Sequence, residues 1–167
     1  QALGRAVQVV LETISSISDE YELIIAEDAS TDGSSELAAK FAREHAQIIH
    51  MHRDERLGRG SALSLAAKIS KGEIFCYFDV DMATDISHLG DLLGLIAGGY
   101  DMATGSRLLP DSRITRSTDR EVKSRGYNFL VRLILKSRLS DHQCGFKAFR
   151  TDVLRDLLDE TRDIHWF

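Results

Sequence analysis

Short apolar segments alternate along the chain with windows of helical periodicity. Strands are predicted at residues 21–26, 47–51, 74–78 and 102–104. Helices are predicted at residues 3–17, 34–44 and 60–70, from Thr84 or Asp85 to Gly98-Gly99, at about 118–137, and from about Thr151. Strands that alternate with helices predict an α/β fold, a Rossmann-like, mostly parallel sheet with helices on both faces.

The chain has the size and composition of one globular domain, with 167 residues, 43% of them apolar and 28% charged. It opens on a helix and has no initiator Met, whereas a sheet of this kind normally opens on a strand. We therefore expect a first strand, and further sequence after Phe167, to lie outside residues 1–167. Cys76 and Cys144 form no CxxC motif, and Cys76 lies in an apolar run, which fits a buried thiol and a reducing cytosol.

Charge is distributed unevenly along the chain. The formal net charge is −5, but residues 107–150 hold eleven Lys or Arg and four Asp or Glu, a net +7. The other residues sum to −12. A basic segment in an acidic protein indicates a local anionic partner, and the alternative is a solvated helix face.

Polar motifs follow the predicted strands, at the edge where parallel sheets bind ligands. Asp79 and Asp81 come directly after strand 74–78. In extended backbone, side chains at i and i+2 point the same way, so the two carboxylates would repel each other unless a cation lay between them. Hard ions such as Mg²⁺ or Mn²⁺ take oxygen ligands, and the alternative is a loop with two solvated aspartates.

Asp28 lies in the string EDASTDGS after the first predicted strand. A carboxylate there can accept hydrogen bonds from a nucleobase or ribose. Thr31 or Asp32 is the predicted cap of the following helix. Further on, Gly58 and Gly60 either let the backbone approach a phosphate at a helix N-terminus or serve a tight turn.

Arg107 follows the fourth predicted strand, and its guanidinium suits a diphosphate. Arg120, Ser124 and Asn128 recur every four residues, so they share one face of the long predicted helix, where Arg120 and Ser124 can face a phosphate. The mostly apolar half from Phe129 to Leu135 belongs either to the core or to a membrane contact.

Six motifs stand in one order: EDASTDGS, LGRGSAL, GEIFCYFDVD, ATGSRL, KSRGYNFL and SDHQCGFKAFR. With these motifs in this order, the chain resembles family 2 glycosyltransferases of the GT-A fold from about Tyr21 to Leu158. It is most similar to the polyprenyl-phosphate sugar synthases, which include dolichyl-phosphate mannose and glucose synthases. The family usually has a Pro-Tyr-Asn-Glu-like motif on its first strand, and its absence here agrees with the expected truncation. Residues 1–167 would then be a glycosyltransferase catalytic domain.

The resemblance implies a role for each motif. Asp79 and Asp81 would bind Mg²⁺ or Mn²⁺ and the donor diphosphate, Asp28 the donor base, and Asp141 would line the reaction centre. Ala83 stands where mannose synthases often have a Gln as a further metal ligand, which leaves the third protein ligand unassigned. The full predicted sets are Asp28, Ser30, Arg59, Asp79, Asp81 and Arg107 for the nucleotide sugar, Arg120 and Ser124 for the acceptor phosphate, and Asp141, Arg107 and Arg120 for catalysis.

The predicted function is inverting transfer of a sugar from a nucleotide-sugar donor to a polyprenyl phosphate at the cytoplasmic face of a membrane, with no nucleic-acid partner. A phosphate monoester has a second pKa of about 6, so as an acceptor it needs little help from a general base. One alternative is a family 2 enzyme acting on a sugar hydroxyl, with Asp141 as the base. Two others are a nucleotidyltransferase and a non-catalytic, donor-binding regulatory module.

Overall fold

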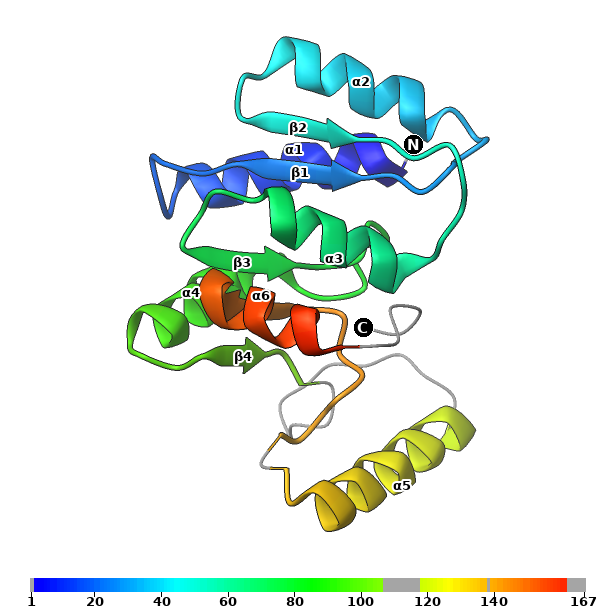
Figure 1. Ribbon diagram of the computed structural model, residues 1–167, viewed down its shortest axis with the longest axis vertical. Coiled ribbons are helices and arrows are strands. Elements are labelled where there is room, and N and C mark those ends of the chain that lie inside the picture. The colour runs from blue at the N-terminus through cyan, green and yellow to red at the C-terminus, as the bar shows by residue number, and fades with distance from the viewer. Residues whose placement is uncertain (1, 107–117, 138, 162–167) are drawn as a thin grey trace.

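The computed structural model describes residues 2–106, 118–137 and 139–161, without the side chains of 118–123 and 125. The chain alternates helices and strands, as predicted (Figure 1). The strands are β1 (Leu23–Ala26), β2 (Ile48–Met51), β3 (Ile74–Tyr77), β4 (Met102–Thr104) and β5 (Lys147–Arg150). The helices are α1 (Ala2–Ser15), α2 (Ser34–Glu44), α3 (Arg59–Ile69), a short 3₁₀ turn η1 (Ile86–His88), α4 (Leu89–Ala97), α5 (Thr118–Leu135) and α6 (Thr151–Glu160).

The strands form two sheets. β1 and β2 pair in parallel, as predicted. β5 lies between β3 and β4 and is antiparallel to both, so β3 and β4 run in the same direction. β5 is not among the predicted strands, because Lys147 and Arg150 stand at its two ends and leave only two apolar residues between them. Lys147 is nevertheless buried, and its Nζ donates to Tyr77 Oη at 3.1 Å.

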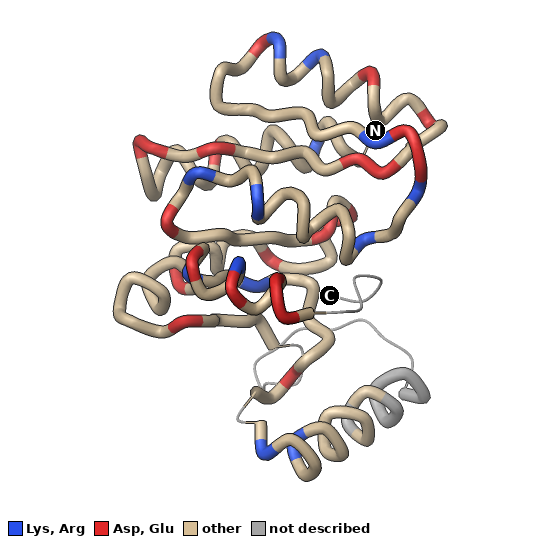
Figure 2. Tube along the Cα trace, in the orientation of Figure 1, with Lys and Arg blue, Asp and Glu red and all other residues tan. Residues whose placement is uncertain are grey.

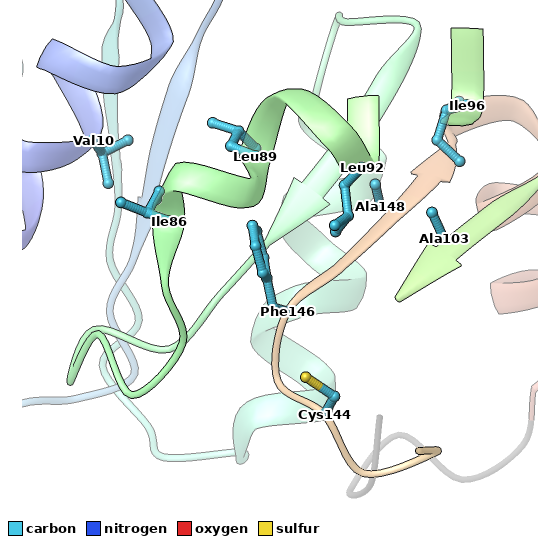
Figure 3. Packing of buried hydrophobic residues seen from close by; sticks show 9 residues of the cluster. All are labelled: Val10, Ile86, Leu89, Leu92, Ile96, Ala103, Cys144, Phe146 and Ala148. Atoms are coloured by element: carbon cyan, nitrogen blue, oxygen red, sulfur yellow. The ribbon is translucent and has the colours of Figure 1, made fainter. Parts of the chain in front are cut away.

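Helices cover both faces of the strands, as the alternation predicts. On one face, α4 and Phe146 pack with Val10 of α1, Ile86 and the small residues Ala103 and Ala148 (Figure 3). On the other face, α3 and α6 pack against Phe75, Tyr77 and Phe149. Successive side chains of β5 point to opposite faces of the sheet, so Ala148 packs in the first core and Phe149 in the second.

A third group of buried side chains joins α1 and α2 to the first sheet through Val7, Ile25, Ala38 and Ile48. Cys76 and Cys144 are both free thiols. Burial raises the pKa of the Cys76 thiol to about 12, so it stays protonated at neutral pH. No helix in the described ranges is both long enough and apolar enough to cross a bilayer.

Two predicted caps can be compared with the structure. Asp85 caps η1 by accepting a hydrogen bond from Ser87 N at 3.0 Å, in agreement with the prediction for Thr84 or Asp85. At α2 the N-cap is Gly33, whose φ of 85° lies in the left-handed region, and not Thr31 or Asp32. Asp32 still supports this helix start, because its Oδ1 accepts from Ser34 N at 3.1 Å.

Leu92 and Leu95 of α4 form a matched pair for testing the core, because Leu92 is buried while Leu95 is 46% exposed. We expect Leu92→Ala to lower the free energy of unfolding by about 2–5 kcal/mol, through lost apolar contacts and the cavity left behind. Leu95→Ala should change it by less than about 1 kcal/mol. Chemical denaturation of both variants measures the difference, and equal losses would contradict the packing of α4.

Candidate functional site

The Asp79 carboxylate lies between a basic side chain and a glycine from distant parts of the chain. Arg59 Nη2 of α3 contacts Asp79 Oδ1 at 3.1 Å. On the other side, a Cβ added to Gly145 would overlap the Asp79 carboxylate. The close approach is possible because Gly145 has no side chain. Three of the quoted motifs, LGRGSAL, GEIFCYFDVD and SDHQCGFKAFR, therefore meet at this carboxylate.

The backbone after Asp79 forms a turn, not the extended segment that was expected. Met82 N donates to the Asp79 carbonyl oxygen at 3.1 Å, and Met82 has a φ of 52°. Asp81 is exposed within this turn, and its Oδ1 accepts from Ala83 N at 3.0 Å. A four-residue turn bends the chain back, so the i, i+2 argument from strand geometry does not apply to this pair.

The donor set at this turn suits a hard divalent cation, because Asp79 and Asp81 offer carboxylate oxygens. In the structure Arg59 supplies the positive charge at Asp79. Both partners of that ion pair are about half-exposed, and such pairs contribute only about 0–1 kcal/mol. A divalent cation would therefore replace Arg59 at the carboxylate at little cost, and the residues present fit Mg²⁺ or Mn²⁺.

Tyr77, two residues before Asp79, contacts two cations. The Arg59 guanidinium carbon is 5.6 Å from the Tyr77 ring centroid, and Lys147 Nζ is 5.7 Å from it. Burial raises the pKa of Tyr77 to about 12, despite the lowering effect of Arg59, so the phenol stays neutral. Cation–π attraction to this neutral ring helps to hold Arg59 over the strand end.

Asp28 organises the start of α3. Its two carboxylate oxygens accept from Leu57 N at 3.1 Å and from Gly58 N at 2.7 Å. Gly58 is the N-cap of α3 and has a φ of 94°, a backbone conformation that favours glycine, and its predicted approach to a phosphate stays a prediction. Asp28 thus positions the helix end that carries Arg59, and its predicted contact with a nucleobase stays a prediction.

The string SDHQCGF connects the remaining motifs. Ser140 Oγ donates to Ser106 Oγ at 2.9 Å, next to the Gly105-Ser106-Arg107 motif. Asn128 Oδ1 of α5 accepts from His142 N at 2.8 Å. Asp141 is 0% exposed, and its Oδ1 accepts from Gln143 N at 3.0 Å. Asp141 therefore lies in a loop held to both β4 and α5.

Some predicted site residues are only partly defined. Arg107 and the side chain of Arg120 lie outside the described residues. Ser124 is buried on the same side of α5 as Asn128, and its hydroxyl has no hydrogen-bond partner among the described residues. Ser30 N donates to the Glu27 carboxylate. The predicted ligand contacts of these four residues stay predictions.

The residues that sequence reasoning missed are those whose role is to position others. Gly145, Tyr77 and Lys147 were quoted only within motifs, and no residue-type pattern indicates that a glycine faces an aspartate 66 positions earlier. A signal did exist for His142, because it directly follows Asp141 and Asn128 had been placed on the face of Arg120 and Ser124.

Comparisons with known proteins agree with the resemblance. The family model described as glycosyl transferase family 2 matches residues 2–158. Glycosyltransferase AglD of Haloferax volcanii is 46% identical over 170 residues, covering 100% of this chain and 27% of that protein. A dolichyl-phosphate beta-glucosyltransferase of Drosophila melanogaster is 30% identical over 156 residues, covering 87% of this chain and 48% of that protein. The chain thus spans less than half the length of these relatives.

A solved structure has the same fold. The mannosyltransferase PcManGT from Pyrobaculum calidifontis, in complex with GDP-Man and Mn²⁺, matches with a TM-score of 0.59 and 19% identity. The match covers 92% of this chain and 43% of that chain. At this identity the likeness shows the fold alone, and it confirms the expected GT-A type of α/β architecture.

Gly145 provides a test of the Asp79 site. In Gly145→Ala the new methyl would displace the Asp79 carboxylate, a side-chain end that can move, so we expect the free energy of unfolding to fall by less than about 2 kcal/mol. Mn²⁺ binding should weaken by about tenfold or more, because a displaced ligand no longer meets the ion. Metal titration calorimetry on the full-length protein measures this.

The matched control is Gly94→Ala in α4, where an added Cβ has no atom within 4 Å. This variant should bind Mn²⁺ as the unmodified protein does, and it should be slightly more stable because alanine favours the helix. Unchanged Mn²⁺ affinity in Gly145→Ala would contradict the assignment of Asp79 as a ligand.

Proposed function

Because the chain belongs to glycosyl transferase family 2, we propose that it is the catalytic domain of a metal-dependent, inverting glycosyltransferase that moves a sugar from a nucleotide-sugar donor to a polyprenyl phosphate. The observation that carries the proposal is the meeting of Arg59, Asp79 and the Asp141 loop at one strand end. The named activity of the Drosophila relative supports a lipid-phosphate acceptor. The GDP-Man and Mn²⁺ of the solved neighbour support the donor and metal classes.

On the donor side, Asp79 and Asp81 would hold Mg²⁺ or Mn²⁺. When bound, the ion would supply Lewis-acid stabilisation for the charge on the leaving diphosphate. Arg59, no longer required at Asp79, would then pair with a donor phosphate within reach of its guanidinium. Asp28 would contact the donor base while it holds Gly58 N, since each carboxylate oxygen can accept more than one hydrogen bond.

On the acceptor side, the protonation state of the nucleophile decides which groups the enzyme needs. A phosphate monoester is mostly dianionic at neutral pH, so it requires positive charge for binding rather than a base for activation. Arg107 and Arg120 are the proposed phosphate contacts. Asp141 would line the reaction centre in a loop that Asn128 and Ser106 hold in place.

The described part of α5 supports a lipid surface close to the site. Its apolar side chains are exposed, which is unusual for an 18-residue helix in a soluble domain. Figure 2 shows that the only charges on this part of the helix are basic and lie near its end. Exposed apolar residues with Arg132 among them and Lys136 directly after the helix fit an interfacial helix on an anionic bilayer. The exposed apolar residues are Tyr127, Phe129, Leu130, Leu133, Ile134 and Leu135.

The proposed reaction can be tested with full-length protein, Mn²⁺ or Mg²⁺, polyprenyl phosphate and three donors, UDP-Glc, UDP-GlcNAc and GDP-Man. We expect label from one donor to enter a chloroform-soluble product, and chelation or Asp79→Asn to reduce the rate at least about 100-fold. Transfer only to water-soluble glycans would refute the lipid-phosphate acceptor and favour a sugar hydroxyl. No transfer to any acceptor, with donor still bound, would favour a regulatory module.

The membrane contact of α5 can be tested with full-length protein reconstituted in vesicles that contain anionic lipid. An environment-sensitive fluorophore attached to Ile134→Cys should report an apolar surrounding, because this position would lie among the acyl chains. The matched control is Leu95→Cys on α4, which is also exposed but lies in the core-packed part of the domain. Equal, water-like emission at both positions would contradict the contact.

A further inference from the structure

Two histidines and a glutamate lie together at the end of the first sheet. The register pairs Ile25 with His50 and Ala26 with Met51, and Glu27 N continues it by donating to the Met51 carbonyl oxygen at 2.9 Å. Glu27 is therefore beside His52. Because side chains two residues apart share a face, His50 and His52 project to the same side of β2.

The ligand atoms of these three residues are close to one another. Glu27 Oε2 is 2.5 Å from His52 Nδ1 and 4.0 Å from His50 Nε2. One nitrogen or oxygen from each side chain lies within 4.8 Å of the others. At metal–ligand bonds of about 2.1 Å, tetrahedral ligands lie roughly 3.4 Å apart, so shifts of about 1 Å in the side chains would bring all three to one ion.

Burial leaves one of these atoms unsatisfied. His50 is only 14% exposed, and its Nε2 has no hydrogen-bond partner among the described residues. A buried polar atom without a partner costs about 1–3 kcal/mol, so its position needs an explanation. Nε2 approaches the carboxylate oxygen that His52 contacts, which is where a shared ion would lie.

The carboxylate is ready to act as a ligand. Burial raises the pKa of Glu27, but hydrogen bonds from Ser30 and His52 outweigh it and leave the pKa below its ordinary value. Glu27 is therefore ionised at neutral pH although its side chain is 3% exposed. A buried carboxylate normally needs a compensating cation. Glu27 raises the pKa of His52, so a proton on His52 supplies that charge in the metal-free protein, and a bound ion would take the place of this proton.

We propose that Glu27, His50 and His52 form a binding site for Zn²⁺ or a similar transition-metal ion, separate from the Asp79 and Asp81 pair. Imidazole nitrogen suits zinc, whereas Mg²⁺ and Mn²⁺ favour ligand sets made of oxygen. Two histidines and one glutamate leave the fourth position to water or to Ser35, whose Oγ is 3.3 Å from His52 Nδ1. Asp54 Oδ1, 3.4 Å from His52 Nε2, would orient that ring from outside.

The ion would have a structural role and no direct part in the reaction. It would join β1 to β2 directly before Asp28, whose carboxylate holds the turn that starts α3. Zinc would therefore stabilise the loop that Asp28 and Ser30 belong to, without contacting the reacting sugar. This role does not depend on the identity of donor or acceptor, so it can be tested without an activity assay.

The test uses full-length protein stripped with a chelator and titrated with Zn²⁺, with thermal unfolding and the visible spectrum of added Co²⁺ as readouts. We expect one ion to bind, the midpoint of unfolding to rise, and Co²⁺ to give tetrahedral absorption bands. Asp79→Asn should keep all three signals. His52→Gln should weaken binding at least about 10–100-fold, the loss seen when only an outer partner of a ligand is removed.

His52 is 44% exposed, so its replacement leaves the core intact, and His50→Gln tests the buried ligand as a second variant. His88→Gln is the matched control, because His88 is an exposed histidine hydrogen-bonded to a carboxylate, Asp91, at 2.9 Å. It should bind zinc like the unmodified protein. Zinc affinity unchanged in both His50→Gln and His52→Gln, or no zinc binding by the unmodified protein, would overturn the proposal.

Discussion

The antiparallel pairing of β5 between β3 and β4 is the constraint on which the candidate site depends. It places Lys147 opposite Tyr77 and Thr104, and so it brings the end of the SDHQCGF string beside the ends of two other strands. Gly145 then reaches Asp79, and Phe146 accepts from Gly105 N at 2.9 Å. A parallel strand in this position would begin at the opposite end of β3 and β4, and the SDHQCGF string before it would then lie far from Asp79.

Charge at the site is balanced by cations that come from separate elements. Lys147 of β5 and Arg59 of α3 lie 5.7 Å and 5.6 Å from the centroid of the Tyr77 ring, and Arg59 also contacts Asp79. The buried cation is fixed by its bond to the phenol, whereas the half-exposed one contributes little free energy where it is. The difference leaves one cation structural and the other available to an anionic ligand.

The sequence predicted those features of the fold that depend on local residue patterns. Periodicity located the helices and four strands, and the order of six motifs identified the family, which the match over residues 2–158 confirms. β5 was missed because Lys147 and Arg150 leave only two apolar residues between them, and the burial of Lys147 depends on Tyr77, 70 residues away. The turn at Asp81 was missed for a related reason, since strand periodicity does not indicate where a strand ends. Contacts such as Gly145 with Asp79 require the register of the sheet.

The two ends of the described site are positioned by different elements, and the difference suits the proposed reaction. Asp28 is bound through both carboxylate oxygens to the start of α3, so the proposed donor side is fixed to the sheet. On the proposed acceptor side, Ser140 bonds to Ser106, and His142 contacts Asn128 of α5 through both its backbone N and its Nδ1. A nucleotide sugar is a defined, water-soluble ligand that benefits from a preorganised pocket. A lipid phosphate arrives from a bilayer, and the exposed apolar side chains of α5, the helix that holds the Asp141 loop, are the groups that such a surface would contact.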